Sequence, residues 1–412
     1  MSIEVLLARQ PILDLAQQTV AYELLFRDAE WAPELRPLGL AGDEATSQVL
    51  LNAFEELDID DVVGPHMAYV NFTRPLILHP PPFDHRRITI EVLEDVAVDA
   101  LLIAGLRDLR DGGFAIALDD FVYDAQYEPL LELANIVKLD IRAHSRADLA
   151  VQVRLARRPG IVLLAEKVET HAEFQRCREL GFELFQGYFF AMPEKISGQR
   201  APAQRQSVLR LLSVLQDATV RIEQIRDVLV TDPVMSFKLI KLVNSSALYR
   251  GHDVTSLQSA IALLGLNRVR SWASLLALSR LSEKSTALGV STLTRAYLCE
   301  GLGRIATNRE AADDYFTAGL LSTLDAYFNR DMQSLLDELP ISEPIQRALL
   351  RREGRLGAVL HASVQYEQGN YHRIRWWELA RFGIDNEKFE AAYRDALTWA
   401  NLGEDLLRAE VH

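Results

Sequence analysis

The sequence predicts an α/β domain followed by an all-α domain. In the first half, short runs rich in β-branched and aromatic residues alternate with longer stretches of helical spacing. Beyond about residue 205 no run is typical of a strand, and apolar residues recur three or four positions apart. A chain of 412 residues exceeds one ordinary domain. We therefore expect two domains, at 1–195 and 205–412, joined by a linker at 196–204 that is rich in Pro, Gly and polar residues.

Seven strands are expected in the first half, mostly as continuous apolar runs, which is typical of strands buried on both faces. They lie at residues 19–27, 67–72, 87–94, 114–121, 135–141, 160–168 and 184–190. The helical stretches between them include 98–113, which ends at two glycines, and 170–181, which begins at Thr170 and ends at Gly181. Repeated β–α units imply a parallel sheet, either closed as a barrel or open and doubly wound.

The second half is expected to be helical throughout. One helix should end at Asp232–Pro233, because proline cannot continue a helix. Further helices are predicted at 234–246, 256–266 and 268–281.

Composition narrows the classes of function. The formal net charge of −14 argues against a nucleic-acid partner, which needs a basic face. Glu4 and Arg9 interrupt any signal peptide, and no apolar run reaches the roughly 18–20 residues of a membrane helix. Cys177 and Cys299 lie far apart without metal-type spacing, as expected in a reducing compartment. We therefore expect a cytoplasmic protein with no membrane partner.

Polar residues gather at the carboxyl ends of the predicted strands. They are Glu23, Arg27, Asn71, Glu91, Glu94, Asp119, Asp120, Lys138, Asp140, Glu166, Glu169 and Gln186. In a β/α barrel these ends converge on one face, where active sites are built. One acid at a strand end is more often a cap or turn residue, but clustered carboxylates need a compensating charge. Oxygen ligands without nearby Cys or His favour Mg²⁺, Mn²⁺ or Ca²⁺ over zinc.

The same segments resemble, in order and spacing, the EAL domain. The matching segments are "RQPILD" (9–14), "ELLFR" (23–27), "VNF" (70–72), "IEVLE" (90–94), "LDDF" (118–121), "VKLD" (137–140), "AEKVET" (165–170) and "QGYFF" (186–190). The resemblance covers about residues 1–195 and implies a TIM-like (β/α) barrel. It also implies a phosphodiesterase that linearises cyclic di-GMP with Mg²⁺ or Mn²⁺, with Ca²⁺ as an inhibitory ion and a homodimer as the assembly.

The resemblance also implies roles for individual residues. The first metal ion would be held by Glu23, Asn71, Glu91 and Asp119, and the second by Asp120. Lys138 and Glu166 would position the hydrolytic water. Gln10 and Arg27 would contact the nucleotide, and Gln186 would support them at the substrate site. Glu94 and Glu169 would support the loop that follows the aspartate pair.

That loop departs from the family pattern. The family has Gly-Thr-Gly after the aspartate pair and Phe, whereas this chain has Val122-Tyr123-Asp124. Glycine allows positive φ and close backbone approach, and valine disfavours both. Two hypotheses follow for the barrel: it binds the nucleotide with weak hydrolysis or none, or it is a fully active phosphodiesterase that yields linear pGpG.

Two stretches of the second half, "VNSSALYRG" (243–251) and "VTSLQSAIALLGLNRVRSWA" (254–273), resemble the HDOD domain over roughly residues 200–400. HDOD domains are helical relatives of metal-dependent HD phosphohydrolases. Ser322 and Thr323 stand where those enzymes have their metal-binding His-Asp pair, and neither is a good metal ligand. The resemblance therefore implies a non-catalytic domain that binds a protein partner and relays or regulates the state of the barrel.

Overall fold

The computed structural model describes residues 7–26, 59–81, 83–94, 96–192, 203–217, 240, 265–279, 281, 285–307 and 312–408. The chain divides into two compact units, one made of Met1–Phe190 with Glu367–Tyr371 and the other of Ala191–Tyr366 with His372–His412. Residues 196–202 of the predicted linker and most of the helices predicted between 223 and 266 lie outside the described residues, and a helix already begins at Ala203, within the predicted linker.

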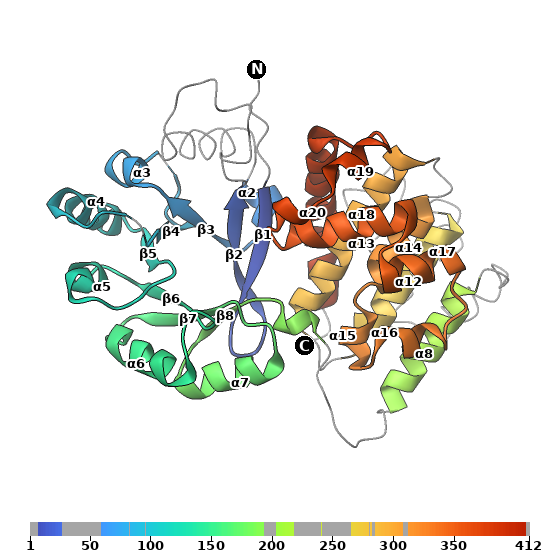
Figure 1. The fold of residues 1–412 in the computed structure, drawn as a ribbon, viewed down its shortest axis with the longest axis horizontal. Coiled ribbons are helices and arrows are strands. Elements are labelled where there is room, and N and C mark those ends of the chain that lie inside the picture. Colours follow the sequence, from blue (N-terminus) through green and yellow to red (C-terminus); the bar gives the residue numbers. More distant parts are fainter. Residues whose placement is uncertain are drawn as a thin grey trace. The chain divides into compact units, whose positions relative to one another are not determined.

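The first unit is a closed barrel of eight strands, which confirms the barrel and excludes the open sheet (Figure 1). The strands are β1 (Leu7–Leu13), β2 (Thr19–Phe26), β3 (Met67–Phe72), β4 (Ile88–Val92), β5 (Ala115–Leu118), β6 (Ile136–Asp140), β7 (Val162–Glu166) and β8 (Leu184–Gln186). They follow one another in chain order around the barrel. All neighbouring pairs from β2 to β8 are parallel, whereas β1 runs antiparallel to both β2 and β8.

Strand β1 was not among the strands predicted. Its sequence, LARQPIL, contains Arg9, Gln10 and Pro11, and a proline inside a run argues against an interior strand. A tight turn makes the hairpin: the Gln17 N–H donates to the Asp14 carbonyl, and Gln17 has a φ of 58°. Strand β1 is thus brought into the barrel by pairing with β2 in this hairpin.

Helices connect the parallel strands and lie outside them in Figure 1. They are α2 (Ile59–Val63), α3 (Arg74–Leu78), α4 (Ala100–Asp111), α5 (Glu128–Leu131), α6 (Arg146–Ala156) and α7 (His171–Leu180), with short 3-10 helices η3 (Ala125–Tyr127) and η4 (Phe189–Ala191). The predicted limits of α7 hold: Thr170 and Glu173 form a capping box, and Gly181 ends the helix with a φ of 88°.

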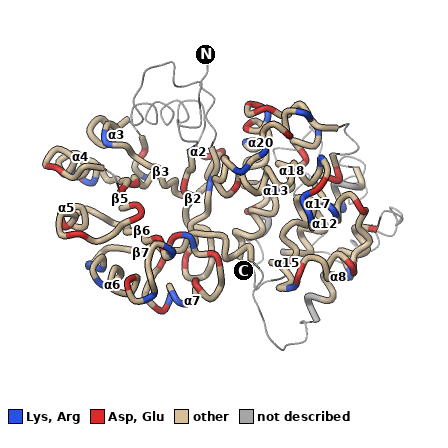
Figure 2. The backbone as a smooth tube through the Cα atoms, viewed as in Figure 1, with Lys and Arg blue, Asp and Glu red and all other residues tan. Residues whose placement is uncertain are grey.

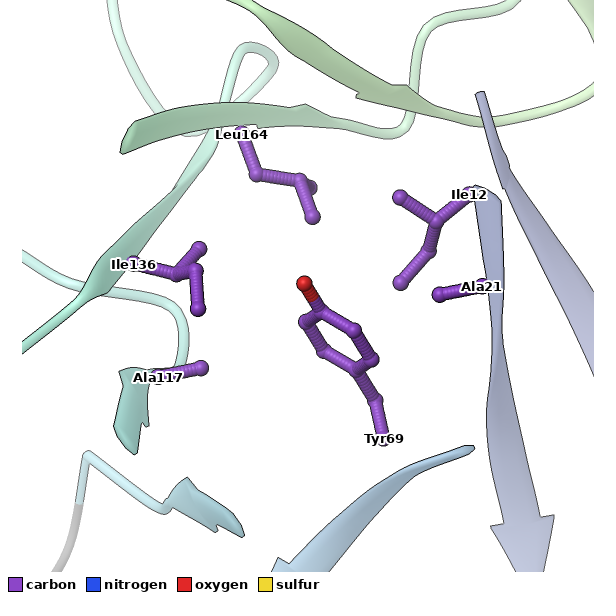
Figure 3. Close-up of a cluster of buried hydrophobic side chains, with 6 residues drawn as sticks. All are labelled: Ile12, Ala21, Tyr69, Ala117, Ile136 and Leu164. Carbon is purple, nitrogen blue, oxygen red and sulfur yellow. The ribbon is translucent and has the colours of Figure 1, made fainter. Parts of the chain in front are cut away.

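A layer of apolar side chains fills the barrel (Figure 3). It consists of Ile12, Ala21, Tyr69, Ala117, Ile136 and Leu164. In Figure 3 the Tyr69 ring is directed among the other five side chains, and burial raises the pKa of its hydroxyl to about 12. Five of the six lie two positions before a polar strand-end residue. Because side chains alternate along a strand, those polar residues face the same interior one layer further on.

The described part of the second unit is helical, as the sequence predicts. It contains α8 (Ala203–Gln216), α12 (Leu266–Ser279), α13 (Thr286–Ala306), α14 (Ala312–Leu321), α15 (Leu324–Phe328), α16 (Met332–Leu336), α17 (Glu343–Arg351), α18 (Gly354–Glu367), α19 (Trp376–Ala380) and α20 (Asn386–Arg408), with η5 (Tyr371–Arg373). The central helix α13 is buried along most of its length and packs against α14 and α20. A side chain at Gly319 would put its Cβ 2.6 Å from Cα of Ala296, so glycine permits the close approach of α14 to α13. Among the described helices, none combines the length and the apolar content that crossing a bilayer requires.

Candidate active site

A single buried lysine lies at the centre of the polar layer. Lys138, on β6, is fully buried, and its Nζ lies 2.6 Å from Asp119 Oδ1 and 2.7 Å from Glu91 Oε1. The distances from Nζ to Glu166 Oε1 and Glu23 Oε2 are 3.0 Å and 3.4 Å. One ammonium thus meets carboxylates from four other parts of the barrel wall, as the convergence of strand ends predicts.

The electrostatics of this cluster are unbalanced, because four carboxylates face one cation. Burial lowers the pKa of Lys138, but the four carboxylates outweigh it and hold that pKa well above its ordinary value. Burial, followed by the charge of Glu23, raises the pKa of Glu91 well above its ordinary range. Burial also raises the pKa of Glu166 to about 8, with Lys138 opposing the rise and Asp119 adding to it. Without a metal ion the cluster therefore reduces its own negative charge by retaining protons.

We expect the metal-free protein to lose stability as the pH rises from about 4.5 towards 8. Native Glu166 keeps its proton up to about pH 8, whereas the unfolded chain releases it near the ordinary value of 4.5. The native state then binds more protons than the unfolded state across this window, so the free energy of unfolding falls with pH. Urea unfolding in EDTA across the window should show this decline, and the decline should be shallower in Glu166→Gln. A variant with the same slope as the wild type would contradict the assignment.

Two glutamines connect the ends of three strands. The Gln186 side-chain amide on β8 donates to Gln10 Oε1 on β1 at 2.9 Å and makes a very short hydrogen bond to Glu23 Oε2 on β2. Glycine is needed next to Gln186, since a Cβ at Gly187 would collide with the Val168 carbonyl oxygen. Gln186 therefore orients Glu23 and Gln10 from within the protein. The nucleotide contacts assigned to Gln10 and Gln186 stay predictions.

The cluster offers several oxygen atoms that the protein itself does not satisfy. Buried acceptors without a hydrogen-bond partner in the described part of the chain include Asn71 Oδ1, Glu91 Oε2, Asp120 Oδ1 and Glu166 Oε2. Buried acceptors without donors are costly, and hard cations prefer such carboxylate and amide oxygens. Among residues 7–26, 59–81, 83–94, 96–192 and the described helices, however, no three His, Cys, Asp or Glu side chains form a ready-made metal-binding group. The donor set fits a hard cation in chemistry, while the metal-ligand assignment stays a prediction.

Three other assigned residues are not among the side chains that contact Lys138 in the described part of the chain, and the position of one of them is not described. Arg27 lies outside the described residues. Glu94 is exposed in the turn after β4. Glu169 is also exposed and pairs with Arg142 at 2.5 Å. The role of Glu94 and Glu169 in supporting the loop after the aspartate pair stays a prediction.

The structure adds a residue that the sequence reading missed. Lys167, directly after β7, has its Nζ 2.6 Å from Asp140 Oδ2 and 3.5 Å from Asp120 Oδ1. Its backbone has a φ of 57°, which is uncommon for a residue with a side chain. In the sequence, Lys167 directly follows the strand-end Glu166 in the acidic segment AEKVE. This position is the signal that could have identified it. In Figure 2, acidic residues mark the chain after β5, and both signs of charge occur near β6 and β7.

The divergent loop after the aspartate pair is held by contacts of its own. The Tyr123 N–H donates to Gln152 Oε1 on α6 at 2.8 Å, and the Tyr123 hydroxyl donates to Glu128 Oε1 at 2.7 Å. Asp124 caps η3 by accepting from the Gln126 N–H at 3.0 Å. Val122 is 49% exposed, so it adds little to this anchoring. The loop is therefore tied to η3, α5 and α6.

In the helical unit, protein groups engage the hydroxyls that stand at the His-Asp position. Ser322 Oγ accepts from Arg295 Nη1 at 3.0 Å and donates to the Gly319 carbonyl at 2.7 Å. Thr323 Oγ1 lies 2.8 Å from Thr292 Oγ1. All four of these side chains are buried. The positively charged guanidinium of Arg295 therefore lies next to Ser322.

Comparison with known proteins finds both domains and full-length relatives. The EAL domain model matches residues 59–193, and the HDOD domain model matches residues 201–339. The chain is 32% identical to the Bacillus subtilis protein YuxH, over 97% of this chain and 98% of that protein. It is 30% identical to the cyclic di-GMP phosphodiesterase CdgJ of Vibrio cholerae, over 95% of this chain and 91% of that protein. Among solved structures, an EAL domain protein from Listeria monocytogenes aligns at 21% identity over 45% of this chain and 87% of that chain, with a TM-score of 0.36.

The relatives align along nearly their whole length, so the match includes both units and their order in the chain. The EAL domain model covers β3 to β8 of the barrel, and the HDOD domain model covers α8 to α16 of the helical unit. The chain belongs to the family of two-domain proteins that join an EAL domain to an HDOD domain.

Proposed function

We propose that this protein is a cyclic di-GMP signalling protein in which the barrel binds the nucleotide and hydrolyses it slowly or not at all. The helical domain is non-catalytic and relays or regulates the state of the barrel through a protein partner. The observation that carries the proposal is the cluster of four carboxylates around the buried Lys138 at the strand ends. The similarity to a protein named cyclic di-GMP phosphodiesterase supports the choice of nucleotide.

The residues divide the work of binding. Glu23, Asn71, Glu91 and Asp119 would hold one Mg²⁺ or Mn²⁺ ion, and Asp120 would serve a second. Such ions supply positive charge that polarises a phosphodiester and lowers the barrier to attack by water. The Lys138 ammonium would hold Glu166 through Oε1, at 3.0 Å. Glu166 Oε2, which has no hydrogen-bond partner among the described residues, would then be left to hold the hydrolytic water.

The loop contacts support slow rather than fast turnover. Hydrolysis needs the water held in line with the scissile bond, and small errors in position cost large factors in rate. The anchored loop Val122–Asp124 begins directly after Phe121, two residues from Asp120, so its contacts with η3 and α6 bear on where Asp120 can move.

A fully active phosphodiesterase that yields linear pGpG, regulated by the HDOD domain, is the second candidate. The 30% identity to CdgJ over 91% of that protein favours it. Incubation of the purified protein with cyclic di-GMP and Mn²⁺, followed by separation of the products, distinguishes the two. Binding of the nucleotide with slow or absent turnover supports the first proposal, and rapid formation of pGpG supports the second.

We expect Glu91→Ala to lose metal binding. Glu91 is completely buried and its Oε2 has no hydrogen-bond partner in the described chain, so this oxygen is among the donors that a cation would gain. Loss of one carboxylate ligand should weaken the affinity for Mn²⁺ by about 10- to 100-fold, on the scale of lost charged hydrogen bonds. Calorimetric titration of Mn²⁺ into wild type and Glu91→Ala measures the difference. Equal affinities would remove Glu91 from the ligand set.

The helical domain should add no phosphohydrolase activity. Ser322 and Thr323 are engaged by Arg295 and Thr292 within the protein, and hydroxyls are poor ligands for a hydrolytic metal. In the full-length Glu91→Ala protein, generic phosphodiester substrates with Mn²⁺ should therefore show no turnover above background. Metal-dependent turnover that survives Glu91→Ala but disappears in Ser322→Ala would place a second active site in the helical domain.

A further inference from the structure

Lys167 places an ammonium group beside the aspartate that is proposed to hold the second ion. Its Nζ lies 2.6 Å from Asp140 Oδ2 and 3.5 Å from Asp120 Oδ1. A lysine side chain is ordinarily a cation at neutral pH, and this one has two carboxylates as its partners.

The protein holds both partners and the lysine backbone in place. Asp140 Oδ1 accepts from the Arg142 N–H at 2.7 Å, which leaves Oδ2 for Lys167. Arg142 Nε in turn donates to the Lys167 carbonyl at 3.2 Å, and its guanidinium pairs with Glu169. Lys167 and Asp120 both have positive φ, 57° and 39°. Positive φ is unfavourable for residues with a Cβ, so the surrounding contacts must maintain it.

Without Lys167, the surroundings of Asp120 would suit a divalent cation. Asp120 Oδ1 and Glu166 Oε2 are both buried and lack a hydrogen-bond partner within the described residues, and Glu166 is only 7% exposed. The Lys167 side chain is 51% exposed, so it can leave its partners without unfolding the barrel.

We propose that Lys167 is a built-in cation that competes with the second divalent ion for Asp120. This inference rests on the proposed function. In it the barrel binds one Mg²⁺ or Mn²⁺ ion at Glu23, Asn71, Glu91 and Asp119. A second ion enters only when Lys167 leaves Asp120. The ammonium neutralises part of the charge of Asp120 and repels an incoming ion. Half-exposed ion pairs contribute little free energy, so Lys167 should weaken the affinity of the second site for a divalent ion by about 10-fold without abolishing binding.

The number of bound ions tests this inference directly. Mn²⁺ is titrated calorimetrically into the full-length wild type, Lys167→Met, Lys167→Gly and Lys167→Arg, and electron spin resonance reports coupling between two neighbouring Mn²⁺ ions. We expect one tight ion in wild type and Lys167→Arg. Lys167→Met and Lys167→Gly should each bind a second ion at least about 10-fold more tightly than wild type does, with spin coupling. Adding Asp120→Asn to Lys167→Met should remove the gained ion.

The matched control is Gln17→Gly, because Gln17 has nearly the same φ, 58°, in the turn between β1 and β2. It should leave the titration unchanged, which shows that relief of a positive φ elsewhere in the barrel does not create an ion site. Lys167→Met and Lys167→Arg both keep a Cβ at position 167 and differ in charge, so their comparison separates the charge of Lys167 from its backbone. Two equally tight ions in wild type, or variants that titrate like wild type, would overturn the inference while leaving the first metal site intact. A wild type that binds no ion refutes the proposed first site. In that case the inference is still supported if Lys167→Met binds one ion and the double variant Lys167→Met/Asp120→Asn does not. It is overturned if neither of these two variants binds an ion.

Discussion

Lys138→Met should lower the free energy of unfolding of the barrel by about 3–5 kcal/mol in EDTA, the range observed when one partner of a buried ion pair is removed. Lys138 is fully buried, and its Nζ lies within 3.4 Å of four carboxylates. The methionine fills a similar volume but leaves these carboxylates without a countercharge. Any hydrolysis should also be lost, because Glu166 would no longer be held through Oε1.

Urea unfolding followed by circular dichroism measures this effect, and the transition that shifts with Mn²⁺ identifies the barrel. Mn²⁺ should restore part of the lost stability, because an ion that binds only the folded state stabilises it by mass action. The matched control is Arg86→Met, which removes a cation of the same unit from an exposed ion pair with Asp84. This control should unfold at nearly the same urea concentration as wild type. A Lys138→Met barrel as stable as the control would show that the carboxylates discharge themselves completely by retaining protons.

Replacement of Val122-Tyr123-Asp124 by Gly-Thr-Gly should raise the turnover of cyclic di-GMP by about 10²-fold, the scale on which misplacement of reacting groups acts. The present loop is tied to α6 and α5 by Tyr123, whose N–H bonds Gln152 and whose hydroxyl bonds Glu128. The replacement removes the hydroxyl contact to Glu128 and the Asp124 cap of η3. Glycines then permit the positive φ and close approach that valine resists. Nucleotide affinity should change little, because the residues proposed to bind the nucleotide lie outside the loop.

Turnover rates and binding isotherms measured on the same preparations separate the two effects. Tyr123→Phe is the matched control: it removes only the hydroxyl bond to Glu128 and should leave the rate within a few-fold of wild type. A replacement that turns over no faster than wild type would mean that the loop is not the limiting feature. Fast turnover by the wild type, lost in Asp120→Asn, would instead support the fully active phosphodiesterase.

The choice of a closed barrel over an open sheet rested on the resemblance to the EAL domain. The sequence by itself determined the α/β and all-α halves and the gathering of polar residues at the strand ends. These follow from local rules: strands buried on both faces are continuous apolar runs, and parallel strands bring their carboxyl ends to one edge. Alternation of side chains then placed Asn71 and Lys138 one layer beyond Tyr69 and Ile136, inside the barrel. Only residues near in sequence, and the period of the strand, were needed for these predictions.

Only the tertiary structure decided which strand completes the barrel and which cation meets which carboxylate. Strand β1 has Arg9, Gln10 and Pro11 at its centre, so its pattern alone does not indicate a strand, and it is formed through pairing with β2 and β8. Lys138 and Glu23 are 115 positions apart, and Lys167 and Asp120 follow β7 and β5, which lie on either side of β6. Distances of this kind depend on closure of the whole barrel and on rotamers chosen by burial and charge, and no local pattern of residues encodes them.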